Sequence, residues 1–221
     1  MEIAIQGLLF LGIIPALILL FIGLKGYDGL YKEKTIFLTF IIGIIFGVVA
    51  AVVRLVTRPP VFLIVYIIIF AFFEQLIKTI VLNIGRLHGK KETVIYGLSL
   101  GLGFGSSFTP FLVIAGSMES TDLSFISLIA FGSLGFIFFH AATSAYIGYG
   151  VYKNKLMKYL LIAILFQIPF NAIVDVTRTK YHAYTQLVLV IYGLILFWYV
   201  IIRVMPNIIK DEKRKRKLKK K

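Results

Sequence analysis

The chain has 221 residues, 59% of them hydrophobic, a mean hydropathy of +0.93 and a formal net charge of +14. Since a membrane-spanning helix needs about 20 apolar residues, a chain of this composition is expected to be a polytopic membrane protein without a soluble domain. It contains no cysteine, which excludes disulfides, thiolate metal ligands and a cysteine nucleophile.

Seven apolar stretches, separated by charged or Pro/Gly-rich breaks, predict an all-α transmembrane bundle of about seven spans. They cover residues 3–24, 35–57, 60–84, 94–116, 124–152, 157–177 and 183–205. The first stretch has no basic segment before it and no small-residue cleavage site after it, so we expect it to remain as a helix. Residues 1–205 would then form a single transmembrane domain, and residues 206–221 a polybasic tail.

Lysine and arginine gather in alternate loops, at residues 25–34, 86–91 and 153–158, and nine more lie between Lys210 and Lys221. The positive-inside rule then predicts an outer amino terminus and a cytoplasmic tail, in a multi-pass protein of the cell membrane. Arg54 and Arg58 are assigned to an outer loop and its flank. The tail is expected to lie on anionic lipid headgroups of the bilayer, and it has no interleaved aromatic residues that would favour specific nucleic-acid binding.

The third stretch carries polar groups at its centre, namely Glu74, Gln75 and Lys78. An ionised side chain near the middle of a bilayer costs about 2.5 to 3.5 kcal/mol, so these groups need partners inside the bundle. Glu74 and Lys78 stand four residues apart, which allows an ion pair within the helix. In the fourth stretch, Gly97, Gly101 and Gly105 recur at the same spacing and predict a closely packed central helix.

Polar residues also mark the fifth and sixth stretches. His140 is followed by Ser144 on one helical face, and Gln167, Asn171 and Asp175 follow at intervals of four. Glu74, His140 and Gln167 each lie roughly 15 to 18 Å from the cytoplasmic end of their helix at 1.5 Å per residue. We therefore expect a polar core near the midplane, built by the third, fifth and sixth helices. The simplest interpretation is ordinary hydrogen bonding between helices.

Four segments in this order resemble the PrsW-type intramembrane metalloprotease family, which is related to the broader CAAX-protease-like membrane proteases. They read FEQLIK at 73–78, VIYGLSLGLGF at 94–104, HAATSAYIGYG at 140–150 and FQIPFNAI at 166–173. The resemblance covers residues 70–175. It implies a divalent metal within the membrane and cleavage of substrate helices there. Glu74, Lys78, His140 and Asn171 match the family's positions.

The departures from the family pattern bear on catalysis. Gln75 replaces a glutamate, Phe108 stands where the third motif has a glutamate, and Gln167 replaces a histidine. A catalytic zinc needs about three nitrogen or carboxylate ligands and an open position for water. Of the family's set, Glu74 and His140 remain as good donors.

Two hypotheses follow from this ligand set. The favoured one is a non-catalytic relative, without a cofactor, that binds transmembrane segments of other proteins or a small polar ligand. The alternative is an atypical active metalloprotease that holds zinc or another divalent metal with Glu74, His140 and Asp175, with Glu74 and His140 as catalytic residues.

Two further classes are weaker. Midplane polar residues and proline-interrupted helices are typical of ion or solute transporters, but the chain shows no internal repeat. A rhomboid-type serine hydrolase is disfavoured because Ser106 and Ser107 do not lie in a Gly-x-Ser-x-Gly turn.

Overall fold

The computed structural model describes the backbone of residues 2–57, 63–116, 123–179 and 183–210; among these, the side chains of 2–9, 11, 108–116, 123–126, 129, 176–179 and 183 are not described. The described chain is helical and contains no strand, which confirms the all-α prediction. The helices are α1 (Glu2–Leu24), α2 (Glu33–Val56), α3 (Leu63–Leu82), α4 (Thr93–Gly116), α5 (Leu123–Tyr152), α6 (Leu156–Thr179) and α7 (Ala183–Tyr199), followed by the π-helical segment η2 (Val200–Val204).

Within the described residues, five helical stretches are long and apolar enough to cross a membrane, which supports a multi-pass membrane protein. They are Glu33–Val56, Leu63–Leu82, Ala130–Tyr152, Leu156–Asp175 and Tyr184–Lys210. The shorter apolar helix Gly12–Leu24 belongs to α1. The sequence predicts that the transmembrane domain ends at residue 205. The last helical stretch runs further, because it continues through η2 as far as Lys210.

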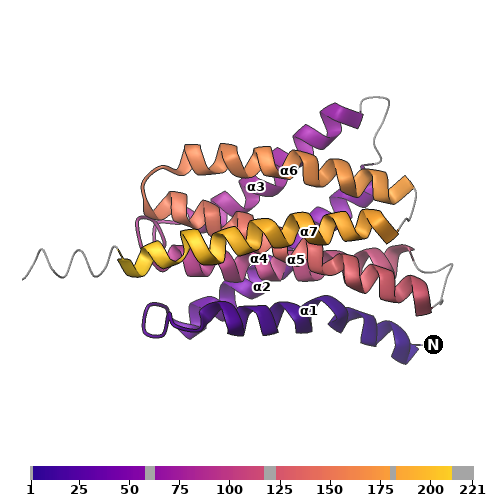
Figure 1. Cartoon of the computed structure of the whole chain (residues 1–221), viewed down its shortest axis with the longest axis horizontal. Helices are drawn as coiled ribbons and strands as arrows, with labels where there is room; N and C mark the ends of the chain where they lie inside the picture. Colours follow the sequence, from indigo (N-terminus) through magenta and orange to yellow (C-terminus); the bar gives the residue numbers. More distant parts are fainter. Residues whose placement is uncertain (1, 58–62, 117–122, 180–182, 211–221) are drawn as a thin grey trace, which may run out of the picture.

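α4 lies at the centre of the bundle and packs against α1, α2 and α5 (Figure 1). Glycines on opposite faces make this possible. A Cβ at Gly101 would lie 2.1 Å from the carbonyl oxygen of His140 on α5, and one at Gly103 would lie 2.1 Å from that of Phe40 on α2. Both distances are far inside van der Waals contact, so only a residue without a side chain fits there. Gly97 and Gly105 also face α5.

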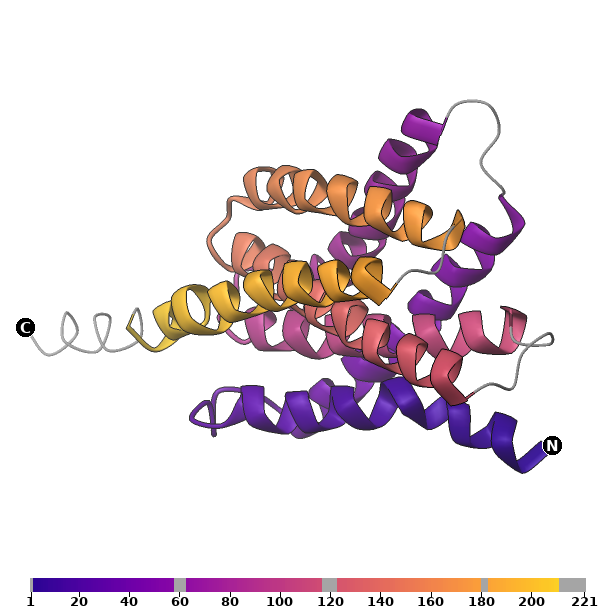
Figure 2. The same ribbon diagram turned by 45° about the vertical axis from the view of Figure 1, so that its right-hand side comes forward.

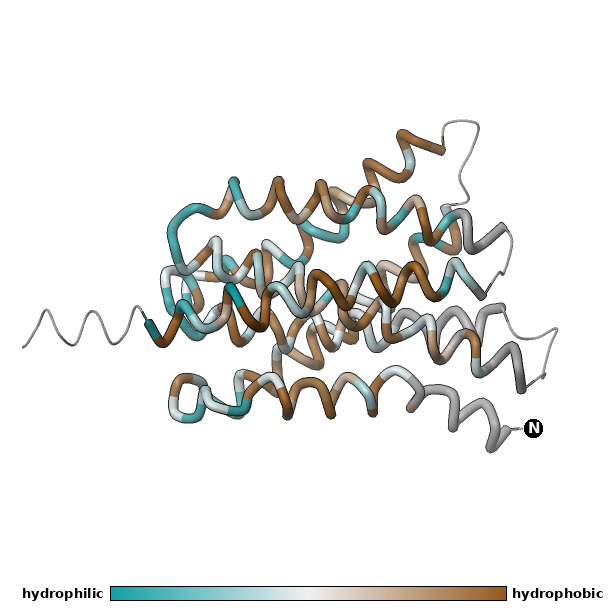
Figure 3. The backbone as a smooth tube through the Cα atoms, in the orientation of Figure 1, coloured by the Kyte–Doolittle hydropathy of each residue, from teal (hydrophilic) through white to brown (hydrophobic). Residues whose placement is uncertain are grey.

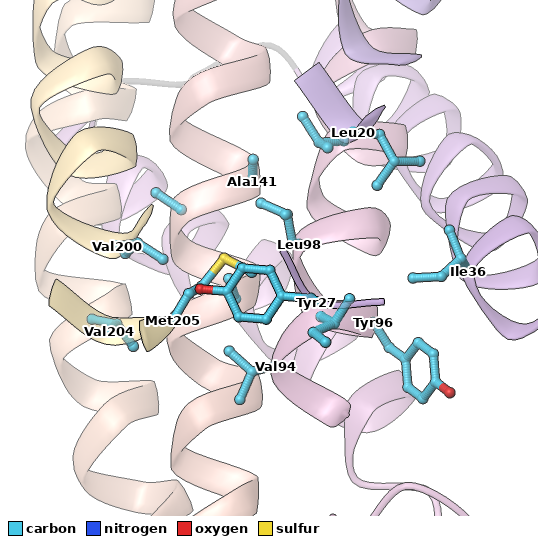
Figure 4. Close-up of a cluster of buried hydrophobic side chains, with 14 of the residues drawn as sticks. Leu20, Tyr27, Ile36, Val94, Tyr96, Leu98, Ala141, Val200, Val204 and Met205 are labelled. Carbon is cyan, nitrogen blue, oxygen red and sulfur yellow. The ribbon is translucent and has the colours of Figure 1, made fainter. Parts of the chain in front are cut away.

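An apolar cluster joins α1, α2, α4, α5 and η2 (Figure 4). Leu20 and Ile36 meet Leu98 of the central helix, while Ala141 and Met205 approach from the other side, and all five side chains are buried. This part of the bundle is therefore held together by small residues and aliphatic contacts.

α3 is placed differently. It crosses the bundle at an angle, and its Leu63 end stands away from the other helices (Figures 1 and 2). It packs chiefly on α6, where Ala71 meets Leu160 and Ile164, and it touches α5 and α4 less extensively. α3 and α6 thus form a pair at one side of the bundle, and this pair carries most of the polar residues singled out in the sequence.

The loops at residues 25–32, 83–92 and 153–155 lie at one end of the bundle, and hydrophilic residues gather there (Figure 3). These loops contain the basic clusters from which we predict that this end of the bundle is cytoplasmic. The tail beyond Lys210, Arg58 and the side chain of Phe108 lie outside the described residues.

Candidate functional site

Polar side chains from α3, α5 and α6 meet inside the bundle. None of these side chains is more than 2% exposed: Glu74, Gln75, Lys78, His140, Thr143, Ser144, Gln167 and Asn171. Their spacing along each helix places them on one face, and that face points away from the lipid. The structure therefore buries all eight of these side chains, and hydrogen bonds connect six of them: Gln75, Lys78, His140, Thr143, Gln167 and Asn171.

Lys78 links α3 to α5. Its Nζ lies 2.7 Å from Nδ1 of His140, donates to Oγ1 of Thr143 at 3.1 Å and reaches Oε1 of Gln75 at 3.4 Å. It also lies 4.9 Å from the centre of the Phe104 ring, and the π face of an aromatic ring attracts a cation. Because an ammonium group has donors only, a charged Lys78 makes Nδ1 the acceptor and leaves the imidazole proton on Nε2.

The ion pair that the spacing of Glu74 and Lys78 allows does not form within 4.0 Å. Arg54 and Asp175 form such a pair in the core instead. The physical reason is the direction of the Lys78 side chain, whose ammonium nitrogen lies closest to its acceptors on α5, Nδ1 of His140 and Oγ1 of Thr143.

Amide side chains link α3 to α6. Nε2 of Gln75 donates to Oε1 of Gln167, and Nε2 of Gln167 donates to Oδ1 of Asn171 at 3.0 Å. Nδ2 of Asn171 lies 3.5 Å from the carbonyl oxygen of Ile67 on α3. Gln75 and Gln167, which stand where the resemblance expects a glutamate and a histidine, are therefore bonded to each other.

Arg54 completes the core from the last turn of α2, because its side chain points into the bundle and not toward the loop that it flanks. Its side chain is 4% exposed. Nη1 donates to Oδ1 of Asn171 at 3.1 Å, and Nη2 lies 2.9 Å from Oδ1 of Asp175 and 3.4 Å from the carbonyl oxygen of Asn171. The guanidinium carbon also lies 5.0 Å from the centre of the Phe70 ring.

A sequence signal for Arg54 exists. Gly43, Gly47, Ala50 and Arg54 follow one another at intervals of four, three and four, and all four are buried. Residues at this spacing share one helical face, and small residues mark faces that pack against other helices. The inward direction of Arg54 could have been inferred from this stripe.

The three residues considered as metal ligands are not brought together. No group of three or more His, Asp and Glu side chains in the described part of the chain is arranged to hold a metal ion. Asp175 pairs with Arg54, and His140 faces Lys78. Glu74, His140 and Asp175 therefore do not fit a zinc site with three protein ligands and an open position.

His140 is also surrounded by phenylalanine rings. Its ring centre lies 4.6 Å from that of Phe104, 5.4 Å from Phe139, 5.9 Å from Phe170 and 6.3 Å from Phe136. Aromatic side chains therefore form much of the surroundings of the imidazole.

Four buried polar atoms have no hydrogen-bond partner among the described residues: Nε of Arg54, Oε2 of Glu74, Oγ of Ser144 and Oδ2 of Asp175. Glu74 lies in the electric field of Arg54, Lys78 and Asp175. In their ionised forms, Arg54 and Lys78 each carry a positive charge, and Glu74 and Asp175 each carry a negative charge. These four side chains together therefore have no formal net charge. An unpartnered buried polar atom costs about 1 to 3 kcal/mol, so water or a small polar molecule would be stabilised beside these atoms.

Comparisons with protein-family models, with curated proteins and with solved structures gave no match to this chain. The polar side chains of the core form a buried network of hydrogen bonds that joins four helices, α2, α3, α5 and α6.

Proposed function

We propose that this protein is a non-catalytic, multi-pass protein of the cell membrane, with a scaffold of the PrsW type, whose buried polar core binds a small polar ligand. The resemblance of the four segments between residues 70 and 175 supports the scaffold. The basic loops at one end of the bundle support a cytoplasmic carboxyl terminus. The basic tail then anchors the chain on anionic lipid headgroups.

The contact between Lys78 and His140 carries the proposal. A histidine that ligates a metal must offer an unprotonated ring nitrogen to a cation. Here Nδ1 lies 2.7 Å from Nζ of Lys78, and aromatic side chains surround the ring. Since Asp175 is likewise used by Arg54, the chain's own cations hold the groups that a hydrolytic site needs free.

The unpartnered atoms offer both donors and acceptors to a small polar ligand. Oε2 of Glu74 and Oδ2 of Asp175 accept hydrogen bonds, Nε of Arg54 donates one, and the Ser144 hydroxyl does either. A ligand that both donates and accepts would satisfy these atoms without adding net charge to the core. A transmembrane segment of another protein is the second candidate, because the Leu63 end of α3 stands away from the bundle and exposes Ile64 and Ile69.

Metal content and proteolysis test the non-catalytic part. The chain, purified without chelators, is analysed for bound metals and incubated with helical membrane substrates, beside Gln75→Glu/Phe108→Glu/Gln167→His. Zinc that is bound with structural strength survives dialysis. If the wild type has no such site, we expect it to retain less than about a tenth of an equivalent of metal after dialysis. Cleavage by the wild type that is lost in Glu74→Ala or His140→Ala would overturn the proposal.

Thermal stability tests the ligand part. The purified chain is heated in detergent with millimolar glycine, acetate, ammonium or guanidinium as probes. We expect glycine, which carries both donors and acceptors, to raise the melting temperature of the wild type more than the other probes. The rise should disappear in Glu74→Gln and persist in Thr39→Val, whose buried hydroxyl bonds only within α2. Equal shifts in both variants would contradict a ligand in the core.

A further inference from the structure

A hollow of about 510 Å³ opens at the end of the bundle that carries the basic loops. Its walls come from the turn between α5 and α6 and from the segment between α3 and α4. The lining includes His88, Val151, Asn154, Lys155, Met157 and Lys158. The hollow is separate from the polar core, since it shares no residue with it.

The charge of the lining suits an anion. Lys155 and Lys158 are exposed at the rim, and no acidic side chain belongs to the lining as the described residues form it. The His88 ring is oriented by Asn83, whose Oδ1 lies 2.8 Å from Nδ1. α6 begins at Leu156, so the positive end of its helix dipole also lies in the wall.

An apolar stripe leads away from the hollow along α6. Met157 is 64% exposed, Leu161 49% and Leu165 64%, and these residues follow one another at intervals of four. They therefore share one face of the helix, which faces outward. In a membrane protein such a face contacts acyl chains, and here it begins at the lysine-lined rim.

We propose that this hollow binds the phosphate headgroup of an anionic membrane lipid, with an acyl chain lying along Met157, Leu161 and Leu165. The lysine ammonium groups and His88 contact the phosphate, and Asn154 contacts the glycerol part of the headgroup. A free phosphate ion offers the same charge, but it would make no use of the apolar stripe. Basic pockets between helices on the cytoplasmic side are suited to such headgroups.

Lipid retention tests the proposal. The full chain is reconstituted into nanodiscs with equal amounts of phosphatidylglycerol and phosphatidylcholine of the same acyl chains, extracted into mild detergent and examined by native mass spectrometry. We expect preferential retention of one phosphatidylglycerol. Lys155→Gln/Lys158→Gln should weaken its binding roughly 25-fold, at about fivefold for each lysine near the surface. The matched control Lys25→Gln/Lys34→Gln removes the same charge at the same end, from the loop after α1 and the first turn of α2, and should retain the lipid.

Three outcomes would overturn the proposal. Equal loss in both double variants would mean that the lipid responds to surface charge in general. Equal retention of both lipids by the wild type would show that the headgroup charge is not recognised. A third arm adds inorganic phosphate at millimolar concentration, and full displacement of phosphatidylglycerol by this ion would identify an anion site in which the apolar stripe has no part.

Discussion

Two regions of this bundle are joined to their surroundings by different physical means. Around α4, helices touch at glycine, where backbone meets backbone, and aliphatic side chains fill the remaining space. The α3–α6 pair is joined to α2 and α5 through buried polar side chains, with Lys78 contacting His140 and Arg54 contacting Asp175. In lipid, close packing and interhelical hydrogen bonds are the two available sources of helix association, and this chain separates them in space.

The difference has a consequence for function. The glycine contacts leave no room for a larger side chain, and they offer no side-chain donor or acceptor that a ligand could use. A polar interface offers donors and acceptors, and four of its atoms still lack partners in the described structure. Binding is therefore expected at the α3–α6 side, while the α4 side maintains the architecture.

The largest effect is expected from breaking the polar interface at its ion pair. Arg54→Met leaves the Asp175 carboxylate buried without its cation, which typically costs about 3 to 5 kcal/mol of unfolding free energy. Arg54→Met/Asp175→Leu removes both charges and should recover most of that loss. Unfolding in mixed micelles measures both variants. If the double variant were no more stable than the single one, the pair would not be the source of the effect.

At the glycine interface, a larger side chain should lower the unfolding free energy by overpacking. Gly101→Ala places a methyl group against the His140 carbonyl oxygen, and α4 must separate from α5, which typically costs about 1 to 3 kcal/mol. Gly85→Ala is the matched control, because a Cβ there would meet nothing within 4 Å. The same unfolding measurement applies. Equal stability of the two variants would contradict the close approach of α4 and α5.

An effect of similar size is expected where α3 meets α5. His140→Leu removes the closest acceptor of Lys78, and a hydrogen bond to a charged group contributes about 1.5 to 3 kcal/mol. In a double-mutant cycle with Lys78→Met, the two changes should couple by about 1.5 kcal/mol or more. Additive effects of the two substitutions would show that the side chains do not interact.

The smallest effect is expected at the amide pair. Gln75→Leu and Gln167→Leu remove two neutral partners, and such interhelical hydrogen bonds in membranes average about 0.6 kcal/mol in double-mutant cycles. A coupling of this size would rank the amide bond below the charged contacts. A coupling larger than that of Lys78 with His140 would reverse the ranking proposed here for the polar interface.

The helices and the polar core were accessible from the sequence because both depend on local patterns. Apolar length predicts the helical stretches, and the α3 bounds of residues 63 and 82 lie within three residues of the predicted 60 and 84. The shared depth of Glu74, His140 and Gln167 follows from counting residues. The hydrogen-bond partners do not follow from counting residues, because a side chain such as Lys78 reaches several positions on two helices. Only the packing decides whether Lys78 contacts Glu74 or His140.

Arg54 was missed for a related reason. An arginine near the end of a hydrophobic stretch is normally assigned to the membrane surface, where long basic side chains reach water. Its inward direction depends on the stripe of Gly43, Gly47 and Ala50, which turns this face of α2 toward the bundle. The buried acceptors on α6 then complete the contact, and no periodicity within α2 alone reveals them.

The distance between Lys78 and His140 tests most directly the claim that Lys78 occupies the histidine which a metal site would need free. Solid-state NMR of ¹⁵N-labelled protein in bilayers can detect a correlation between Lys78 Nζ and His140 Nδ1, with His140→Phe used to distinguish this ring from those of His88 and His182. We expect a strong correlation, consistent with 2.7 Å. A His140 signal typical of a metal-bound imidazole, without a contact to Lys78, would contradict it.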